Sequence, residues 1–169
     1  MELEENVSKT DVKATNAEIM QFVCFKLADE QYAIDITKVQ EVLRVPKITS
    51  VPQMPDFVLG VVNIRGKVVP VFDLHKKFKL PDNPINDQTK ILVANIGGIL
   101  LSFVIDEILD NIKLDMNKID PTPNVKMKIQ KECIRGIGVI EGRMIIILDL
   151  NTLNDVLNLD ISNFRTNKE

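Results

Sequence analysis

Alternating hydrophobic and polar positions recur along most of the chain and predict short β-strands. Residues 21–27 (QFVCFKL) and 31–36 (QYAIDI) form one pair, separated by a polar segment that suits a hairpin turn. Residues 90–96 (KILVANI) and 99–105 (ILLSFVI) form a second pair, and the Gly-Gly dipeptide between them is a strong turn signal. The middle of the chain is therefore expected to consist of antiparallel hairpins.

Two further hairpins resemble each other closely and indicate an internal duplication. Residues 64–74 read IRGKVVPVFDL and residues 140–150 read IEGRMIIILDL, so a constant shift aligns their turn glycines, Gly66 and Gly142. A slightly smaller shift aligns earlier segments, in which residues 32–35 (YAID) match residues 103–106 (FVID). Four blocks recur in the same order with their Gly, Asp and Pro residues kept, which favours duplication over the chance similarity of valine-rich strands.

The duplication predicts an all-β fold of two similar five-stranded barrels, because closing each sheet removes its exposed edges. We expect the domain to span residues 19–158, with a first barrel over about 20–82 and a second over about 83–155. An exchange of strands across that boundary is left open. The polar ends, residues 1–18 and 159–169, are expected to be flexible tails.

One or two short helices complete the expected fold. Residues 37–43 begin with a capping-box pattern and continue with apolar residues at helical spacing, which predicts a short helix. Residues 151–157 predict a second helix, with Asp149 or Asn151 as its cap.

Composition places the chain among ordinary globular proteins and argues against nucleic-acid binding. Hydrophobic residues make up 45% and charged residues 27%, and the net charge of −3 leaves no basic excess for a phosphate backbone. Aromatic residues, on which single-stranded bases stack, account for only 5%.

No stretch reaches the roughly 18 apolar residues of a membrane span, and the first 20 residues lack an apolar signal core. We therefore expect a cytoplasmic protein without direct membrane insertion.

No group of residues has the spacing of a catalytic or metal site. Cys24 and Cys133 stand alone and far in sequence from the single histidine, His75, which favours buried free thiols over metal ligands. His75 lies in the polar run HKKFK, which we interpret as a solvated, charged surface. We expect no enzymatic activity and no cofactor. The aspartates that recur in both copies are expected to cap turns or helices: Asp35, Asp73, Asp106 and Asp149.

Taken together, residues 32–42 (YAIDITKVQEV) and 60–74 (GVVNIRGKVVPVFDL) resemble the CheW family of chemotaxis coupling proteins, and the similarity covers roughly residues 20–155. The resemblance implies two five-stranded SH3-like barrels, in agreement with the duplication. It also implies a non-enzymatic adaptor that binds the cytoplasmic tip of chemoreceptors and the regulatory domain of the CheA histidine kinase. Such an adaptor is expected to be monomeric alone and to join rings or arrays at the inner face of the membrane.

The resemblance also assigns a polar pair to the receptor surface. Glu41 and Arg65 match the Glu and Arg that lie close together in the family, and a guanidinium can bind a carboxylate through two hydrogen bonds. The alternative is that this pair only joins the short helix to the turn at Arg65. The second copy carries Glu141 in place of Arg65, so the pair is expected in the first copy alone.

Apolar site residues follow from the same resemblance. Ile36, Val39 and Val104 match positions near the groove between the barrels, where a receptor helix could lie, although each is equally compatible with a core position. Val125 matches a larger apolar residue in a second kinase contact.

Two other classes of function remain as alternatives. Small β-barrels often bind oligonucleotides, and a salt-dependent interaction with single-stranded DNA would support that function here. An enzyme with an unrecognised site is the other alternative, and loss of turnover on mutation of His75 or a cysteine would support it.

Overall fold

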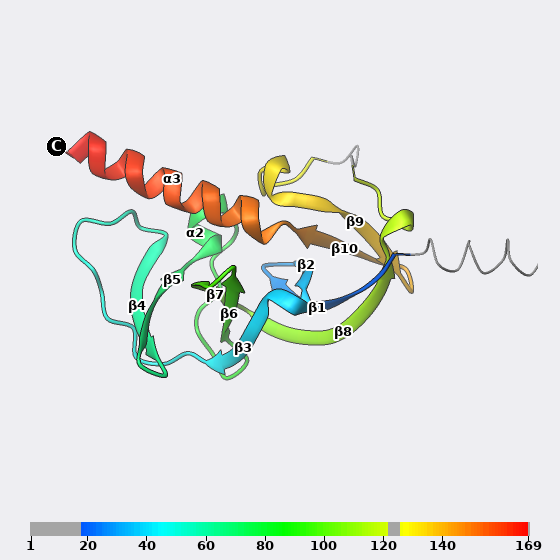
Figure 1. Cartoon of the computed structure of the whole chain (residues 1–169), viewed down its shortest axis with the longest axis horizontal. Helices are drawn as coiled ribbons and strands as arrows, with labels where there is room; N and C mark the ends of the chain where they lie inside the picture. The colour runs from blue at the N-terminus through cyan, green and yellow to red at the C-terminus, as the bar shows by residue number, and fades with distance from the viewer. Residues whose placement is uncertain (1–17, 122–125, 169) are drawn as a thin grey trace, which may run out of the picture.

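Two curled five-stranded sheets form the body of the molecule, as a computed structural model describes for residues 18–121 and 126–168 (Figure 1). The strands in chain order are β1 (Ile19–Leu27), β2 (Glu30–Asp35), β3 (Val39–Arg44), β4 (Val58–Ile64), β5 (Lys67–Phe72), β6 (Lys90–Ile96), β7 (Ile99–Ile105), β8 (Glu107–Asp115), β9 (Ile134–Ile140) and β10 (Arg143–Leu148). The helical elements are η1 (Ile36–Lys38), α2 (Leu74–Phe78), η2 (Met116–Lys118), η3 (Lys131–Cys133) and α3 (Leu150–Lys168). The all-β fold expected from the sequence is confirmed.

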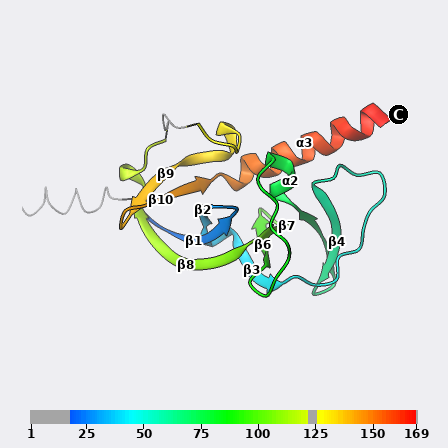
Figure 2. The same ribbon diagram turned by 180° about the vertical axis from the view of Figure 1, so that it is seen from behind.

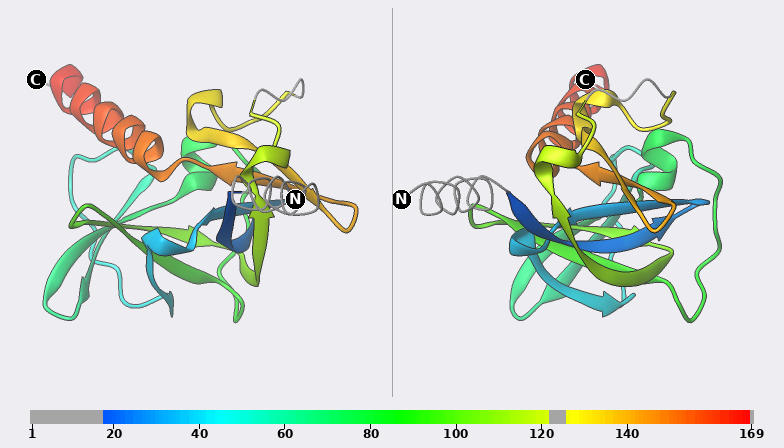
Figure 3. Two further views of the ribbon diagram at one scale, coloured as in Figure 1. Left: turned by 45° about the vertical axis from the view of Figure 1, so that its right-hand side comes forward. Right: turned by 90° about the vertical axis from the view of Figure 1, so that its right-hand side faces the viewer.

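The two sheets have the same strand order once the duplication is taken into account. Barrel A has the order β8-β1-β2-β10-β9, and barrel B has the order β3-β6-β7-β5-β4. The two shifts found in the sequence relate β1, β2 and β3 to β6, β7 and β8, and β4 and β5 to β9 and β10. Each barrel therefore combines the first two strands of one copy with the last three strands of the other, an exchange that the sequence left open. Barrel B is continuous over residues 39–105, and barrel A flanks it in the chain (Figure 3).

Each sheet is closed by the chain segment that follows β3 in barrel B and β8 in barrel A. Thr49 and Val61 exchange two backbone hydrogen bonds, both of 2.8 Å, and Asp120 and Ile137 exchange the equivalent pair of 3.0 and 2.9 Å. In each barrel, these bonds join the last strand of the sheet order, β4 or β9, to the chain segment that continues from the first strand, β3 or β8. Because the two edges are joined in this way, little of either sheet is left open for further pairing.

A glycine makes each closure possible. A Cβ atom added to Gly60 would lie 2.1 Å from the carbonyl oxygen of Thr49. At the equivalent Gly136, it would lie 2.9 Å from the carbonyl oxygen of Asp120 and 2.4 Å from Ile119. The backbone of Gly60 also has a φ of +145°, a region that other residues rarely adopt.

The largest apolar cluster lies between the two barrels. Along β1, Phe22 and Cys24 face the interior of barrel A, whereas Val23, Phe25 and Leu27 face barrel B. The strands β2, β6 and β7 alternate in the same way, so these four strands are buried on both faces. The rings of Phe25 in barrel A and Phe103 in barrel B have centroids 5.6 Å apart.

The C-terminal helix connects the two barrels. α3 leaves β10 of barrel A and extends over α2 toward barrel B (Figures 1 and 2). Lys77 of α2 forms an ion pair with Asp160, and the Arg165 guanidinium lies 3.7 Å from the sulfur of Met54. The expectation of a flexible tail over residues 159–169 is therefore wrong for residues 159–168, because the helix begun at Leu150 continues and contacts barrel B.

The short helix expected over residues 37–43 is also wrong. The Asp35 carboxylate accepts hydrogen bonds from the backbone N–H of Thr37 and from its hydroxyl, which hold a single 3-10 turn over Ile36–Lys38. From Val39 the chain pairs with β6, because β-branched residues suit a strand and the partner strand is available. The helix after Asp149 is confirmed, and Asp149 accepts a hydrogen bond from the N–H of Thr152. The expected N-terminal tail lies outside the described residues except for Glu18.

Gly60→Ala is expected to lower the free energy of unfolding by more than about 2 kcal/mol, because the new methyl group must displace a closing backbone carbonyl. Urea unfolding followed by circular dichroism measures the change. Gly66→Ala is the control, since Gly66 has a φ of +84° but nothing within 4 Å of an added Cβ. Equal losses in the two variants would contradict the role of Gly60 in closure.

Candidate functional site

Glu41 lies on β3 at the mouth of barrel B. It pairs with Val93 of β6 directly after an irregularity between Val39 and Glu41. Residues opposite each other on paired strands have side chains on the same face, and Val93 belongs to the core of barrel B. The Glu41 side chain therefore lies on the core-facing side of β3, and only 16% of it is exposed.

Arg65 reaches Glu41 from the tip of the β4–β5 hairpin. Arg65 and Gly66 form a two-residue turn with φ values of 52° and 84°, and the Asn63 side chain accepts a hydrogen bond of 2.9 Å from the Gly66 N–H. Nη2 of Arg65 donates to Oε2 of Glu41 at 3.1 Å, with 82% of the arginine side chain exposed. The pairing expected from the sequence is therefore present, and most of the guanidinium is open to a partner.

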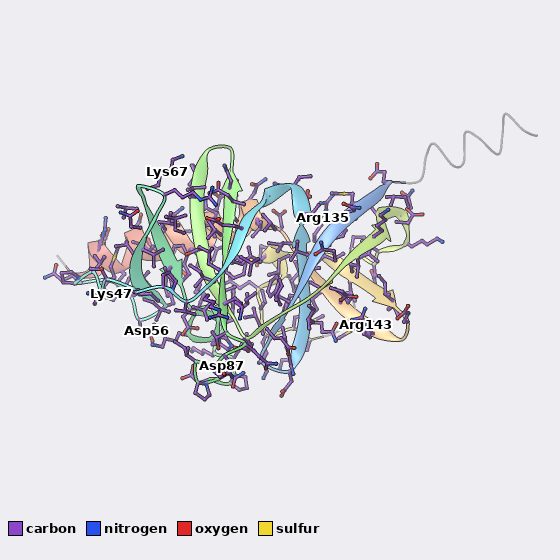
Figure 4. All side chains as sticks on the ribbon, turned by 90° about the horizontal axis from the view of Figure 1, so that it is seen from below. Lys47, Asp56, Lys67, Asp87, Arg135 and Arg143 are labelled. Atoms are coloured by element: carbon purple, nitrogen blue, oxygen red, sulfur yellow. The ribbon has the colours of Figure 1, made fainter. Side chains whose placement is uncertain are left out.

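The pair spans the seam of one barrel and has no equivalent in the other. β3 and β4 lie at opposite ends of the strand order of barrel B, so the Glu41–Arg65 contact crosses the line where the barrel closes. In barrel A, the equivalent positions are Ile112, which is buried in the core, and Glu141 at the hairpin tip. The tips are far apart, as the equivalent side chains Lys67 and Arg143 show (Figure 4).

Ile36 and Val39 lie beside this pair in the chain. Both are half-buried and pack against the cluster between the barrels, and Val39 pairs with Ala94. The structure thus brings two of the expected apolar residues to the segment that carries Glu41. Both side chains therefore lie at the junction of the two barrels.

Val104 lies elsewhere. The alternation of β7 directs Phe103 and Ile105 into the cluster between the barrels and Val104 into the core of barrel B, with 7% of it exposed. Its exposed part borders a surface cavity of about 410 Å³, which also contacts Leu59 and Ile85. This location differs from the groove between the barrels expected for it. Val125 lies outside the described residues.

Sequence reasoning missed a buried cluster around His75. The imidazole is only 4% exposed, with Nδ1 3.2 Å from Asp73 and Nε2 2.9 Å from Asp106. The interpretation of residues 75–79 as a solvated run is therefore wrong for His75, because the first turn of α2 points its side chain into the protein. The signal that could have found it is the Asp-x-His pattern, in which Asp73 caps α2 and turns His75 inward.

Three of the four repeated aspartates are caps, as expected. Asp35, Asp73 and Asp149 accept hydrogen bonds from the backbone at the start of η1, α2 and α3. Asp106 instead accepts from the Ala28 N–H at 2.6 Å and contacts His75. Burial raises the pKa of Asp73, but the hydrogen bonds that its carboxylate accepts from His75 and from the Lys76 N–H outweigh this effect and hold the pKa below its usual value.

The two cysteines are poor nucleophiles. Cys24 lies in the core of barrel A and Cys133 in the cluster between the barrels, both as free thiols with no exposed surface. Burial is the main cause that raises the pKa of each to about 11. Among the residues described, no three His, Cys, Asp or Glu side chains come together as a metal site. No helix within those ranges is long and apolar enough to cross a membrane.

These features define a class of protein: a two-barrel, all-β domain whose exposed Glu41–Arg65 pair lies on one barrel only. The CheW-like domain family matches residues 21–157. The chain therefore belongs to the CheW-like domain family, whose members are non-enzymatic adaptors.

Individual relatives agree with this assignment. The chemotaxis protein CheW of Klebsiella aerogenes is 35% identical over 133 residues, which cover 79% of this chain and 80% of the relative. The chemotaxis protein CheW of Helicobacter pylori is 33% identical over 147 residues, covering 87% and 88%. The crystal structure of the scaffolding protein TtCheW from Thermoanaerobacter tengcongensis superposes with a TM-score of 0.73 at 34% identity, covering 79% of this chain and 86% of that one.

Cys24 and Cys133 are expected to stay unmodified by a thiol reagent such as DTNB at pH 8, because both are buried and mostly protonated. Release of the coloured product should follow the rate of unfolding in urea. Rapid modification of either thiol in the native protein would contradict this placement.

Arg65→Ala is expected to change the free energy of unfolding by less than about 1 kcal/mol, because the arginine of the Arg65–Glu41 ion pair is exposed to solvent. Denaturant unfolding of this variant and of Glu41→Gln measures the contribution of the pair. A loss of several kcal/mol in both would show that the pair is chiefly a structural connection between β3 and the hairpin.

Proposed function

We propose that this protein is a chemotaxis adaptor that couples chemoreceptors to a CheA-type histidine kinase. The observation that carries the proposal is the family match over residues 21–157, together with relatives named as chemotaxis and scaffolding proteins. The site agrees with a binding role, because an exposed guanidinium is held in place by a carboxylate.

The receptor surface in this proposal is the strip formed by Ile36, Val39, Glu41 and Arg65. The two apolar side chains are half-buried at the junction of the barrels, and the polar pair follows at the mouth of barrel B. An apolar ridge of a receptor helix fits such a strip, and its carboxylates or amides can accept from the remaining N–H groups of Arg65. Val104 would take part only through the separate cavity beside Leu59 and Ile85.

The kinase surface in this proposal lies on barrel A, whose strands β8 and β9 precede and follow Val125 in the sequence. Independent support comes from the β9–β10 hairpin, where the paired residues Val139 and Met144 are 69% and 45% exposed. The two side chains lie opposite each other and form a small exposed apolar patch, which another protein could cover.

The proposal extends to assembly and location. Because the receptor and kinase surfaces lie on different barrels, contacts between partners are heterologous, and such contacts close into rings or extend into arrays. The chain would be a monomer alone and would join an array beneath the receptors, at the cytoplasmic face of the membrane.

Oligonucleotide binding is not favoured as an alternative. The net charge is −3, and the described aromatic rings are mostly buried in the cores instead of forming a stacking surface.

Arg65→Glu is expected to weaken binding to receptor tips about tenfold or more, because it places two carboxylates together and removes the only donor of the pair. The measurement is a pull-down or a titration with the purified cytoplasmic tip, with circular dichroism to verify the fold. Glu141→Arg is the matched control, since it reverses a charge at the equivalent hairpin tip of barrel A. Unchanged binding by a folded Arg65→Glu variant would contradict the assignment of Arg65 to the receptor surface.

A further inference from the structure

The chain passes from barrel B to barrel A at a single buried residue, Asp106. It follows the last residue of β7 and precedes the first residue of β8. Its backbone N–H donates to the Lys26 carbonyl at 2.9 Å, and its carboxylate accepts from the Ala28 N–H at 2.6 Å. Both contacts attach this crossover to the β1–β2 hairpin of barrel A.

The same carboxylate also contacts barrel B through α2. Oδ2 of Asp106 lies 2.9 Å from Nε2 of His75, and Nδ1 of His75 lies 3.2 Å from Asp73. Because an ionised carboxylate only accepts hydrogen bonds, both contacts are hydrogen bonds at the same time only when each imidazole nitrogen carries a proton. The result is a chain of contacts from α2 through His75 and Asp106 to Ala28.

The surroundings of His75 stabilise its positive charge. The hydrogen bond to Asp73 is the main cause that raises its pKa to about 9; burial opposes the rise, and the contact with Asp106 adds to it. Lys76 and Asp82 border the cavity beside the ring, and Lys77 is paired with Asp160. Two carboxylates thus face the imidazole directly.

The second crossover, from barrel A to barrel B, has no such contact between a histidine and the crossover aspartate. Its aspartate, Asp35, corresponds to Asp106 and caps η1 through Thr37. The residue equivalent to His75 is Asn151, which is exposed at the start of α3. The contrast between two otherwise equivalent crossovers indicates that His75 has a role that the fold alone does not require.

We propose that His75 is a charged lock between the barrels: its imidazolium bridges Asp73 and Asp106 and fixes the crossover of barrel B against the β1–β2 hairpin of barrel A. The lock is closed at neutral pH and opens when the imidazole loses its proton. The neutral ring has a single N–H, so it can no longer donate to Asp73 and Asp106 together, and the relative position of the two barrels loosens.

The first test is the titration of His75 by NMR, which is unambiguous because the chain contains one histidine. The imidazole resonances are expected to shift with a midpoint near pH 9. A midpoint at or below the ordinary value of about 6.5 would overturn the proposal.

The second test is the pH dependence of stability. Because the folded pKa of His75 is raised, its contribution is complete below about pH 6.5 and is lost as the pH rises toward 9. The folding equilibrium constant is expected to fall on the order of a hundredfold over this range, relative to a His75→Gln variant. His75→Arg, which keeps the charge, should retain more of the stability above pH 9 than the wild type does.

The third measurement separates a local lock from a general structural role. In His75→Gln, hydrogen exchange of the Ala28 amide should accelerate more than that of amides within β6. Asn151→Ala is the matched control at the equivalent position and should leave both the exchange and the pH profile unchanged. Uniform acceleration in all strands, or the same pH profile with and without the imidazole, would overturn the lock.

Discussion

The apolar interface between the barrels is the interaction on which the rest of the structure depends. β1, β2, β6 and β7 are buried on both faces, one face inside a barrel and the other against the opposite barrel. Since each barrel takes its first two strands from the other copy of the repeat, neither copy can complete a barrel from its own residues. The interface therefore sets the positions of all peripheral features, including the hairpin that carries Arg65.

Much of this architecture follows from local patterns in the sequence. Strand pairs, turns and the duplication were predictable because alternation and turn glycines act over a few residues. The alignment of the two copies also holds for the closing bridges, where Thr49 and Val61 correspond to Asp120 and Ile137. The pairing of Glu41 with Arg65 was expected only through the family resemblance, since nothing local connects residues 24 positions apart.

Other features depend on contacts that local patterns do not contain. The segment after Asp35 has helical spacing, yet pairing with β6 makes it a strand. The polar end of α3 resembles a tail, but ion pairing with Lys77 holds it on barrel B. His75 is followed in sequence by lysines, and only the fold reveals that the distant Asp106 contacts the ring, together with the nearby Asp73. The environment of Val104 also could not be predicted locally. Its face of β7 points into the core of barrel B because β7 is a strand of that barrel, and this depends on the exchange of strands between the copies.

The continuity of barrel B has a consequence for the order of folding during synthesis. Its five strands lie within residues 39–105, so they are all available before any of β8, β9 or β10 has been made. At that stage β6 and β7 present an apolar face with no completed barrel to cover it. The β1–β2 hairpin has already been synthesised and can shield this face, which limits the exposure of unpaired strands to neighbouring chains. In a nascent chain, the barrel that carries Glu41 and Arg65 would thus fold first. The strands of the other barrel would then close against it.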